Sequence, residues 1–395
     1  MILELHILQN FAPSNLNRDD TGSPKDCEFG GHRRARISSQ CFKRAIRQSF
    51  KEQKLIDESN LASRTKRLVD EITRRLKDGG KDEAEARRVV ENILNGVKLT
   101  VKDDGKTQYL LFLGADEIDA IAGLCLKHWE ALAAVAVATP NEEGGAKKAK
   151  AKDAKKAGAD AIPPEIKKAM LDVLNGGKAA DLALFGRMLA DLPDKNIHAA
   201  SQVAHAISTN KVSMEFDFYT AVDDLRSDDN QGSDMLGTVE FNSACFYRYA
   251  NVDVKQLKDN LDGDGELASK TIQAFIHATV TAIPTGKQNS MAAQNPPSFV
   301  LAVTRDAGLW SLANAFVKPV WPKGESDLVE ESIKALDGYW GDLAGMYGSD
   351  QIKGVWVASL ARNGLVNLKN EKVGDLKALI DGVMSRLDEQ SREAR

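Results

Sequence analysis

A strongly basic segment near the N-terminus constrains this chain more than any other feature. The stretch GHRRARISSQCFKRAIRQSFK, residues 31–51, contains no acidic residue. Its seven basic residues are Arg33, Arg34, Arg36, Lys43, Arg44, Arg47 and Lys51. The complete chain has a net charge of −4, so the other residues more than cancel this local charge. A basic cluster on a mildly acidic chain indicates a localised anion-binding site rather than general attraction to polyanions.

The same segment predicts an amphipathic helix over residues 40–50. Ser38 and Ser39 precede it and are typical N-cap residues. The apolar face comprises Phe42, Ile46 and Phe50, and the outward face comprises Gln40, Lys43, Arg44 and Arg47. The first turn carries no Asp or Glu, so the positive end of the helix dipole can receive phosphate. Two interpretations remain open at this point: an ordinary solvated basic face, or a polyanion-binding surface.

The composition argues against a membrane-spanning protein, a secreted protein and a metal site built on Cys or His. With 395 residues, 43% hydrophobic and 28% charged, and a mean hydropathy of −0.34, the chain can form one large or two modest soluble domains. No apolar run is long enough to cross a membrane, and the segment MILELHILQ is too short and too alternating for a signal peptide. The four cysteines form no CxxC pair, and the six histidines show no metal-ligand spacing. We therefore expect a cytoplasmic protein without a metal site or cofactor.

The first half of the chain predicts a strand, a loop and then helices. Met1–Gln9 alternates like a strand, and the turn-rich loop FAPSNLNRDDTGSPKDCEFGG follows it before the basic helix. Residues 60–138 are mostly helical in pattern, with a hairpin over residues 97–113 that turns at Asp104-Gly105. The Ala/Lys-rich stretch 141–164 predicts a flexible connector, and a specific binding tail is the alternative.

The second half predicts further strands and helices around a protruding loop. The acidic stretch FDFYTAVDDLRSDDNQGSDMLG is typical of such a loop. Thr238–Ala250 and Ser298–Thr304 predict strands, Gly265–Ile283 predicts a helix, and Ala307–Arg395 predicts appended helices. This order fits an α+β fold with a split ferredoxin-like sheet that carries large insertions, which is the platform of RNA-recognition modules. The aromatic signature of those modules is absent, so base stacking on the sheet is not expected.

Several segments resemble a known family. SNLNRDDTGSPKDCEFGGHRRARISSQCFKRAIR is similar to the start of the CasC family, the backbone subunit of the type I-E CRISPR Cascade surveillance complex. The similarity continues in LALFGRM, VAHAIST, FYTAVDDL, EFNSACFYRYANVDV and ATVTAIPTGKQNS. These pieces extend over residues 3–316, whereas the Ala/Lys-rich connector and the C-terminal residues match weakly.

The resemblance implies a hand-like fold and a non-catalytic function. Its parts would be a modified ferredoxin-like, RNA-recognition-like palm, helical fingers and a protruding thumb. The boundaries are 1–59 for the first part of the palm, 60–182 for the fingers, 183–196 for palm, 197–241 for the thumb, and 242–395 for the second part of the palm with C-terminal helices. Copies of the chain would polymerise along CRISPR guide RNA beside other Cascade subunits. The guide would then be displayed for pairing with target DNA, without involvement of a membrane.

The resemblance also implies which residues bind the guide RNA. Contacts to its backbone would come from Arg18, Lys25, Arg36, Ser38, Ser39, Gln40, Lys43, Arg44 and Arg47. Met188 would pack against a base. In the thumb, Phe218, Tyr219, Thr220 and Val222 would lie at one side of a displaced base, with Met235 and Leu236 at the other.

Alternatives remain for some of these residues. Arg18 would fix a turn if it paired with Asp19 or Asp20, and Met188 is by default a core residue. Phe218 and Tyr219 are adjacent and cannot share one strand face, so one of them is expected to pack internally. Lys287 and Gln288 either reach the RNA or lie in a solvated loop.

Two alternative functions also remain. The first is a metal-dependent ribonuclease in which Asp19 and Asp20, or Asp223 and Asp224, hold Mg²⁺. Arg18 beside the first pair argues against it, because an adjacent cation weakens metal capture. The second alternative is a free-standing single-stranded-RNA-binding protein that stays monomeric on RNA.

Overall fold

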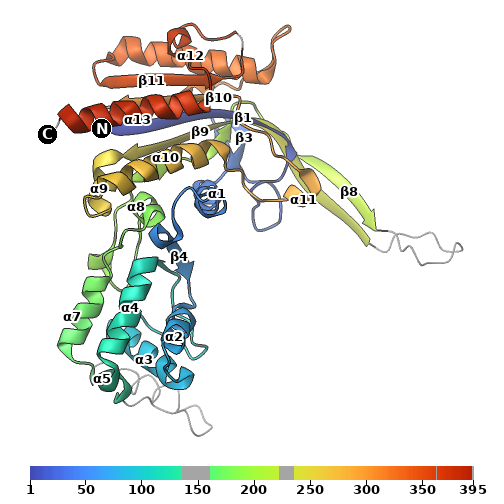
Figure 1. Cartoon of the computed structure of the whole chain (residues 1–395). Coiled ribbons are helices and arrows are strands. Elements are labelled where there is room, and N and C mark those ends of the chain that lie inside the picture. Colours follow the sequence, from blue (N-terminus) through green and yellow to red (C-terminus); the bar gives the residue numbers. More distant parts are fainter. Residues whose placement is uncertain (136–160, 222–234, 362, 394–395) are drawn as a thin grey trace, which may run out of the picture. The chain divides into compact units, whose positions relative to one another are not determined.

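The computed structural model describes residues 1–135, 161–221, 235–361 and 363–393 (Figure 1). These residues divide into two compact units. Unit 1 comprises Met1–Leu55, Ser201–Val254 and Ser269–Arg395, and unit 2 comprises Ile56–Ala200 and Lys255–Ala268. The segment 183–196, which the sequence assigned to the palm, lies within unit 2. Both units mix helices and strands, so the α+β class is confirmed.

An antiparallel sheet forms the centre of unit 1, with nine strands among the described residues. Its main path is β11 (Ile352–Ser359), β10 (Phe299–Arg305), β1 (Ile2–Ser14), β9 (Met235–Asp253), β7 (Ala206–Ser208), β3 (His32–Ile37) and β2 (Asp26–Phe29). The remaining strands, β6 (Ser201–Val203) and β8 (Glu215–Ala221), pair with β9. The strands predicted at residues 1–9, 238–250 and 298–304 are confirmed as β1, β9 and β10, and β1 is longer than predicted.

One face of this sheet carries α1 (Ser39–Glu52) and α10 (Gly265–Thr281). Ile7 of β1, Phe42 of α1 and Thr279 of α10 line one small internal cavity together with Arg248 of β9. The Arg248 guanidinium lies 4.1 Å from the centre of the Phe42 ring and donates to the Gln9 side chain. The predicted apolar face of the basic helix is therefore docked onto the sheet.

The opposite face of the sheet is covered by η3 (Leu312–Phe316) and α12 (Leu328–Tyr347) (Figure 1). Tyr247 and Tyr249 of β9 share one apolar cluster with Phe316 and Trp340. Because successive side chains of a strand point to opposite faces, β1 is buried on both sides. This face of the sheet is therefore occupied by the chain's own side chains.

The buried polar groups on this second face form a connected network. The Glu4 carboxylate accepts from the Tyr249 hydroxyl at 2.6 Å and pairs with Arg305 at 3.0 Å. His6 is fully buried, and its Nδ1 lies 2.9 Å from the Tyr247 hydroxyl. Burial, with a smaller contribution from the Arg305 charge, lowers the pKa of His6 to about 3. His6 is therefore neutral in the folded protein at neutral pH.

The C-terminal part differs from the sequence prediction. Residues 307–395 were expected to be helices only, but β11 pairs with β10 and extends the main sheet. α12 and α13 (Leu376–Glu393) are the helices of this region. The Trp356 ring of β11 covers Gly382 of α13, where a Cβ atom would lie 2.3 Å from the indole nitrogen. The strand was missed because residues 307–395 were assigned from the long helical patterns on either side of it.

Unit 2 contains a helical core and a two-stranded sheet. Its described α-helices are α2 (Leu68–Asp78), α3 (Glu83–Gly96), α4 (Ala115–Lys127), α5 (Trp129–Ala133), α7 (Pro164–Val173), α8 (Ala180–Phe185) and, except for its first residue, α9 (Val254–Asn260). β4 (Ala62–Thr65) pairs with β5 (Leu111–Gly114). The predicted turn at Asp104-Gly105 is confirmed, since Gly105 has a φ of +73° and donates to the Lys102 carbonyl at 3.0 Å. Most of the Ala/Lys-rich connector lies outside the described residues.

Candidate nucleic-acid interface

The N-terminus of α1 has the predicted cap. The Ser38 hydroxyl accepts from the Cys41 backbone nitrogen at 3.3 Å, and the first turn contains no acidic residue. The Ser38 backbone nitrogen donates to the Asn17 side chain at 2.8 Å. Asn17 therefore fixes the start of α1 against the preceding loop, a role that the sequence did not predict although Asn17 lies within the family-like NRDD motif.

The loop over residues 15–25 folds back on itself. Its Arg18 forms an isolated bridge with Pro24, and the Lys25 backbone nitrogen donates to Asn17 at 2.9 Å. The Asp19 carboxylate accepts from Thr21 and Ser23, and Arg18 forms no ion pair among the described residues. The alternative that Arg18 pairs with an adjacent aspartate is therefore wrong. Its guanidinium is exposed instead.

The cations around the first loop and α1 affect the pKa values of two nearby side chains, His205 and Cys41. Burial lowers the pKa of His205, and the charges of Arg36 and Lys25 lower it further. Burial raises the pKa of the Cys41 thiol, while Arg44 and Lys25 oppose that rise. Arg36 also contacts the His205 ring nitrogen at 3.0 Å. Lys25, Arg36 and Arg44 thus act on the same small region of unit 1.

Two arginines of the basic segment do not belong to this charged surface. Arg34 is fully buried, and its guanidinium donates to four carbonyl oxygens, those of Ser208, Thr209, Phe316 and Val317, at 2.6–3.1 Å. Arg33 is exposed but pairs with Asp26. Of the three arginines before the cap, only Arg36 adds its charge to the region around Lys25. The sequence count of seven basic residues therefore overstated the anion site.

The outward face of α1 is less uniform than the sequence indicated. Gln40 and Arg44 are exposed, and Ser39 is half-buried. Lys43 and Arg47 are also half-buried and have other interactions within the chain. Arg44 is therefore the cation on this face that is most accessible to a ligand.

A groove of about 390 Å³ lies beside Arg44 in unit 1. Its walls are residues 16–19 of the first loop, Cys41, Arg44, Ala45 and Gln48 of α1, and the segment 284–286. Gly286 is required there, because a Cβ atom would lie 2.3 Å from the Leu16 carbonyl oxygen. The sequence did not predict this groove, since its third wall comes from far along the chain.

The segment after Gly286 is held by its own hydrogen bonds. The Gln288 side-chain nitrogen donates to the Pro284 carbonyl at 3.0 Å and to the Ala293 carbonyl at 3.2 Å. Gln288 therefore stabilises the segment. Of Lys287 and Gln288, for which the sequence allowed either RNA contact or a solvated loop, only Lys287 keeps its side chain available for RNA.

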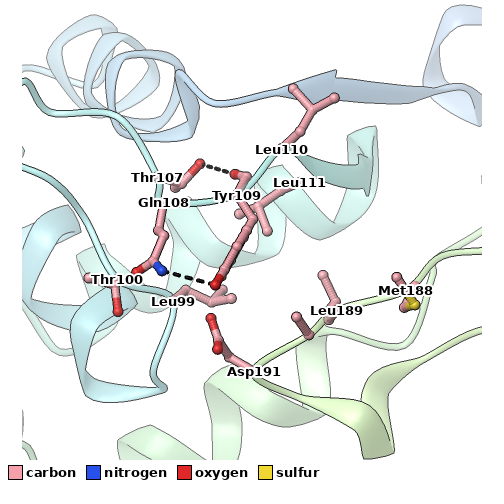
Figure 2. Close-up of a pocket in the computed structure, with 11 residues that line it drawn as sticks. Leu99, Thr100, Thr107, Gln108, Tyr109, Leu110, Leu111, Met188, Leu189 and Asp191 are labelled. Carbon is pink, nitrogen blue, oxygen red and sulfur yellow. Dashed lines mark hydrogen bonds between the residues drawn. The ribbon is translucent and has the colours of Figure 1, made fainter.

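Met188 lies on the surface of unit 2. Its side chain is 82% exposed, so the alternative that it is a core residue is wrong. The preceding Arg187 is buried and pairs with Glu117 at 2.8 Å, which fixes the backbone from which Met188 projects. Figure 2 shows Met188 at the rim of a narrow pocket that Leu99, Tyr109 and Leu189 also line. An exposed methionine on a fixed backbone is suited to contact a ligand.

The predicted protruding loop begins and ends as a hairpin of β8 and β9. Tyr219 lies opposite Gly237, and its ring occupies the space where a Cβ atom of Gly237 would stand. Phe218 points to the other face and is 64% exposed, as Phe216 is at 68%. The two rings point to opposite faces, as predicted. Tyr219 is nevertheless 44% exposed, so it packs on the surface of the hairpin against Gly237 and not inside the protein.

The rest of the predicted thumb is only partly described. Thr220 is exposed and pairs with Leu236, and Met235 pairs with Ala221. These pairs place Met235 and Leu236 on the strand next to Phe218. Val222 lies outside the described residues, as do Asp223 and Asp224.

Two other kinds of feature are absent from the part of the chain that the structure describes. Among the described residues, no group of three or more His, Cys, Asp or Glu side chains is arranged to hold a metal ion. In the same part of the chain, no helix is long and apolar enough to span a membrane.

Comparison with known proteins decides the family. The sequence profile of the CT1975-like proteins matches residues 3–384. The chain belongs to the CT1975-like family. The CasC-type resemblance drawn from the sequence is therefore confirmed. No match was found among curated proteins.

Two solved structures are similar to this CT1975-like chain over nearly its whole length. A chain of a pre-nicking CRISPR RNA-guided surveillance complex has 30% identity and a TM-score of 0.83, with 98% of this chain and 99% of that chain covered. A chain of another CRISPR RNA-guided surveillance complex has 25% identity and a TM-score of 0.71, with the same coverage. The structural similarity to these chains includes the C-terminal residues, which matched the family only weakly in the sequence comparison by motifs.

Proposed function

We propose that this CT1975-like protein is the backbone subunit of a CRISPR RNA-guided surveillance complex and that it binds the guide RNA in unit 1. The observation that carries the proposal is the convergence of Arg18, Lys25, Arg36 and Arg44 around the capped N-terminus of α1. Cations and helix N-terminal amides bind phosphates without regard to base identity. Similarity to chains of two such complexes supports the same function.

The covered sheet supports a backbone-binding mode. In RNA-recognition modules, aromatic residues on an open sheet stack bases. Here η3 and α12 occupy that face, so guide contacts fall to the first loop and α1. The strand order β10-β1-β9-β7, with α1 after β1 and α10 after β9, supports a ferredoxin-like palm. Unit 2 then corresponds to the fingers, and the β8–β9 hairpin corresponds to the thumb.

The thumb would displace a base of the guide and contact the next copy of the chain. Phe218 supports this role, because a large exposed aromatic residue on a two-stranded hairpin is available to pack against a base or a partner. Met188 would pack against a base from its own surface. The undisplaced bases would remain available for pairing with target DNA, beside other Cascade subunits in the cytoplasm.

The proposal is tested by removing two exposed cations. Arg18→Ala combined with Arg44→Ala should weaken binding of a single-stranded guide RNA. Each phosphate contact that is lost should lower the slope of log affinity against log salt by about 0.7. The thermal stability of the free protein should stay the same, because both side chains are exposed. Arg74→Ala in unit 2, where Arg74 pairs with Glu71 on the surface, is the matched control. Unchanged affinity and slope in the double variant would contradict the proposal.

We also propose that the subunit cuts no RNA. Incubation of the assembled complex with matched RNA and Mg²⁺ tests this, because a ribonuclease would release regularly spaced fragments. The third function, a free-standing RNA-binding protein, predicts a monomer on RNA. Sizing of the protein with and without guide RNA separates that function from a filament.

A further inference from the structure

We propose that the groove beside Arg44 recognises the ribose 2′-hydroxyl of the bound strand, and that Asp19 is the residue that distinguishes RNA from DNA. This inference rests on the proposed function, because it specifies which nucleic acid the basic surface selects. The groove is lined by Arg18 and Arg44, which attract phosphate, and also by Asp19, which repels it. A carboxylate repels phosphate but can accept a hydrogen bond from a neutral part of a ligand.

The chemistry of the ribose explains the carboxylate. The 2′-hydroxyl is both a donor and an acceptor, and it is the group by which a protein can tell RNA from DNA. An ionised carboxylate accepts a hydrogen bond from such a hydroxyl and offers nothing to the hydrogen atom that replaces it in deoxyribose. Hydrogen bonds to charged groups are also stronger than those between neutral groups. Two flanking phosphates can then be held by the arginines while the sugar between them is read by Asp19.

Asp19 is held ready for this role. Its Oδ1 atom accepts from the Thr21 backbone at 2.9 Å, the Thr21 hydroxyl at 2.8 Å and the Ser23 backbone at 3.0 Å. These bonds, that of the Thr21 hydroxyl first, lower the pKa of Asp19, so the carboxylate stays ionised near neutral pH. The hydrogen bonds from Thr21 and Ser23 all end at Oδ1, so the exposed carboxylate can accept from a ligand with Oδ2. The turn therefore fixes the orientation of the carboxylate with one oxygen and presents the other.

The opposite walls of the groove supply further polar groups and are rigid. Thr285 contributes an exposed hydroxyl, and Gln48 of α1 contributes an amide, so the groove offers donors to the 2′-oxygen as well. The Gly286 backbone is packed closely on the Leu16 carbonyl, and Gln288 bonds the Pro284 carbonyl. A volume of about 390 Å³ falls in the range of small-ligand sites. The groove is therefore large enough for one sugar-phosphate unit.

The test compares RNA with chemically altered strands of the same sequence. The full-length protein is titrated with single-stranded RNA, with 2′-deoxy DNA and with 2′-fluoro RNA, whose fluorine cannot donate. The native protein should bind RNA more tightly than either analogue. Asp19→Asn keeps an acceptor for the turn but removes the charge. It should reduce the RNA-to-DNA affinity ratio by roughly tenfold, since hydrogen bonds to charged groups are worth about one decade in affinity or more.

The direction of the change separates recognition from a structural effect. With Asp19→Asn, RNA affinity should fall while DNA affinity stays or rises, because the repulsion of phosphate is removed. Asp20→Asn removes an equal charge from the adjacent exposed position outside the groove walls, and it should leave the ratio unchanged. Equal affinity of the native protein for RNA and DNA would overturn the inference, as would a parallel loss of both affinities in Asp19→Asn. Binding of neither strand by the native protein would overturn the proposed function, and this inference with it.

Discussion

Arg34 and Arg44 belong to the same basic segment, yet their surroundings are opposite. Arg34 is fully buried at the edge of the sheet, where four backbone carbonyls from two distant segments accept its hydrogen bonds. Arg44 lies exposed on α1 and lines the groove of about 390 Å³. Two arginines that are equivalent in a charge count thus have different physical roles. The first holds segments of unit 1 together, and the second is available to a ligand.

The same contrast exists between Arg305 and Arg18. Arg305 is buried and its charge is balanced by Glu4, whereas Arg18 is exposed and has no acidic partner among the described residues. A buried cation must be compensated by carboxylates or carbonyls, because desolvation would otherwise outweigh its contribution. Surface cations without a partner add little to stability and are the ones that can bind phosphate. Whether carboxylates or carbonyls within the protein pair with an arginine therefore distinguishes structural from ligand-binding arginines better than its position in the sequence does.

The largest effect is expected at Arg34. Arg34→Met should lower the free energy of unfolding by about 3 kcal/mol or more, because several buried carbonyl oxygens would lose their donor. Urea unfolding of the RNA-free protein measures this change. Arg33→Met, one residue away and exposed, should alter the free energy by less than about 0.5 kcal/mol. Similar losses in the two variants would remove the distinction between buried and exposed arginines.

A smaller effect is expected from acid titration of His6. Its pKa is about 3 in the folded protein and 6.5 as the reference value, so below pH 6.5 the unfolded chain binds a proton that the folded chain does not. Stability contributed by neutral His6 is complete above pH 6.5 and is lost as the pH falls, by about 1.4 kcal/mol per pH unit. Denaturant unfolding between pH 6.5 and 5 measures the slope.

His6→Phe is the variant that isolates this effect. It removes the titrating group from the network of Glu4, Arg305, Tyr247 and Tyr249, so the pH dependence in that window should decrease by about one proton. A slope that is identical in the native protein and in His6→Phe would show that other groups cause the acid sensitivity.

The smallest effect is expected in the β8–β9 hairpin, where Tyr219 packs against Gly237 and the adjacent Phe218 points to the other face. Tyr219→Ala removes the ring that covers Gly237 and should destabilise the hairpin locally by about 1 kcal/mol. Hydrogen exchange of the β8 amides measures this loss. Phe218→Ala should leave exchange unchanged and reduce RNA-dependent assembly, which sizing detects. Faster exchange in Phe218→Ala, or normal assembly, would contradict the assignment of the exposed face to a partner.

The sequence predicted the features that depend on local patterns. Residues close together in the sequence determine each of these features: the cap at Ser38, the apolar face of α1, the turn at Gly105 and the three central strands. Burial of Arg34 could not be predicted, because its acceptors lie near residues 208 and 316. The groove wall at 284–286 and the strand β11 also depend on packing between segments that are far apart in sequence. Long-range packing thus decided which members of a correctly recognised basic segment face solvent.

Because η3 and α12 cover one face of the sheet, that face cannot select among nucleic-acid sequences. A sheet surface that splays bases out and hydrogen-bonds their edges can read base identity. With Phe316 and Trp340 filling that surface from within, the proposed contacts of the first loop and α1 would fall on sugars and phosphates. Such a protein needs no substitution when the sequence it carries changes. The variable information then resides entirely in the nucleic acid, and an organism can renew it without altering the protein.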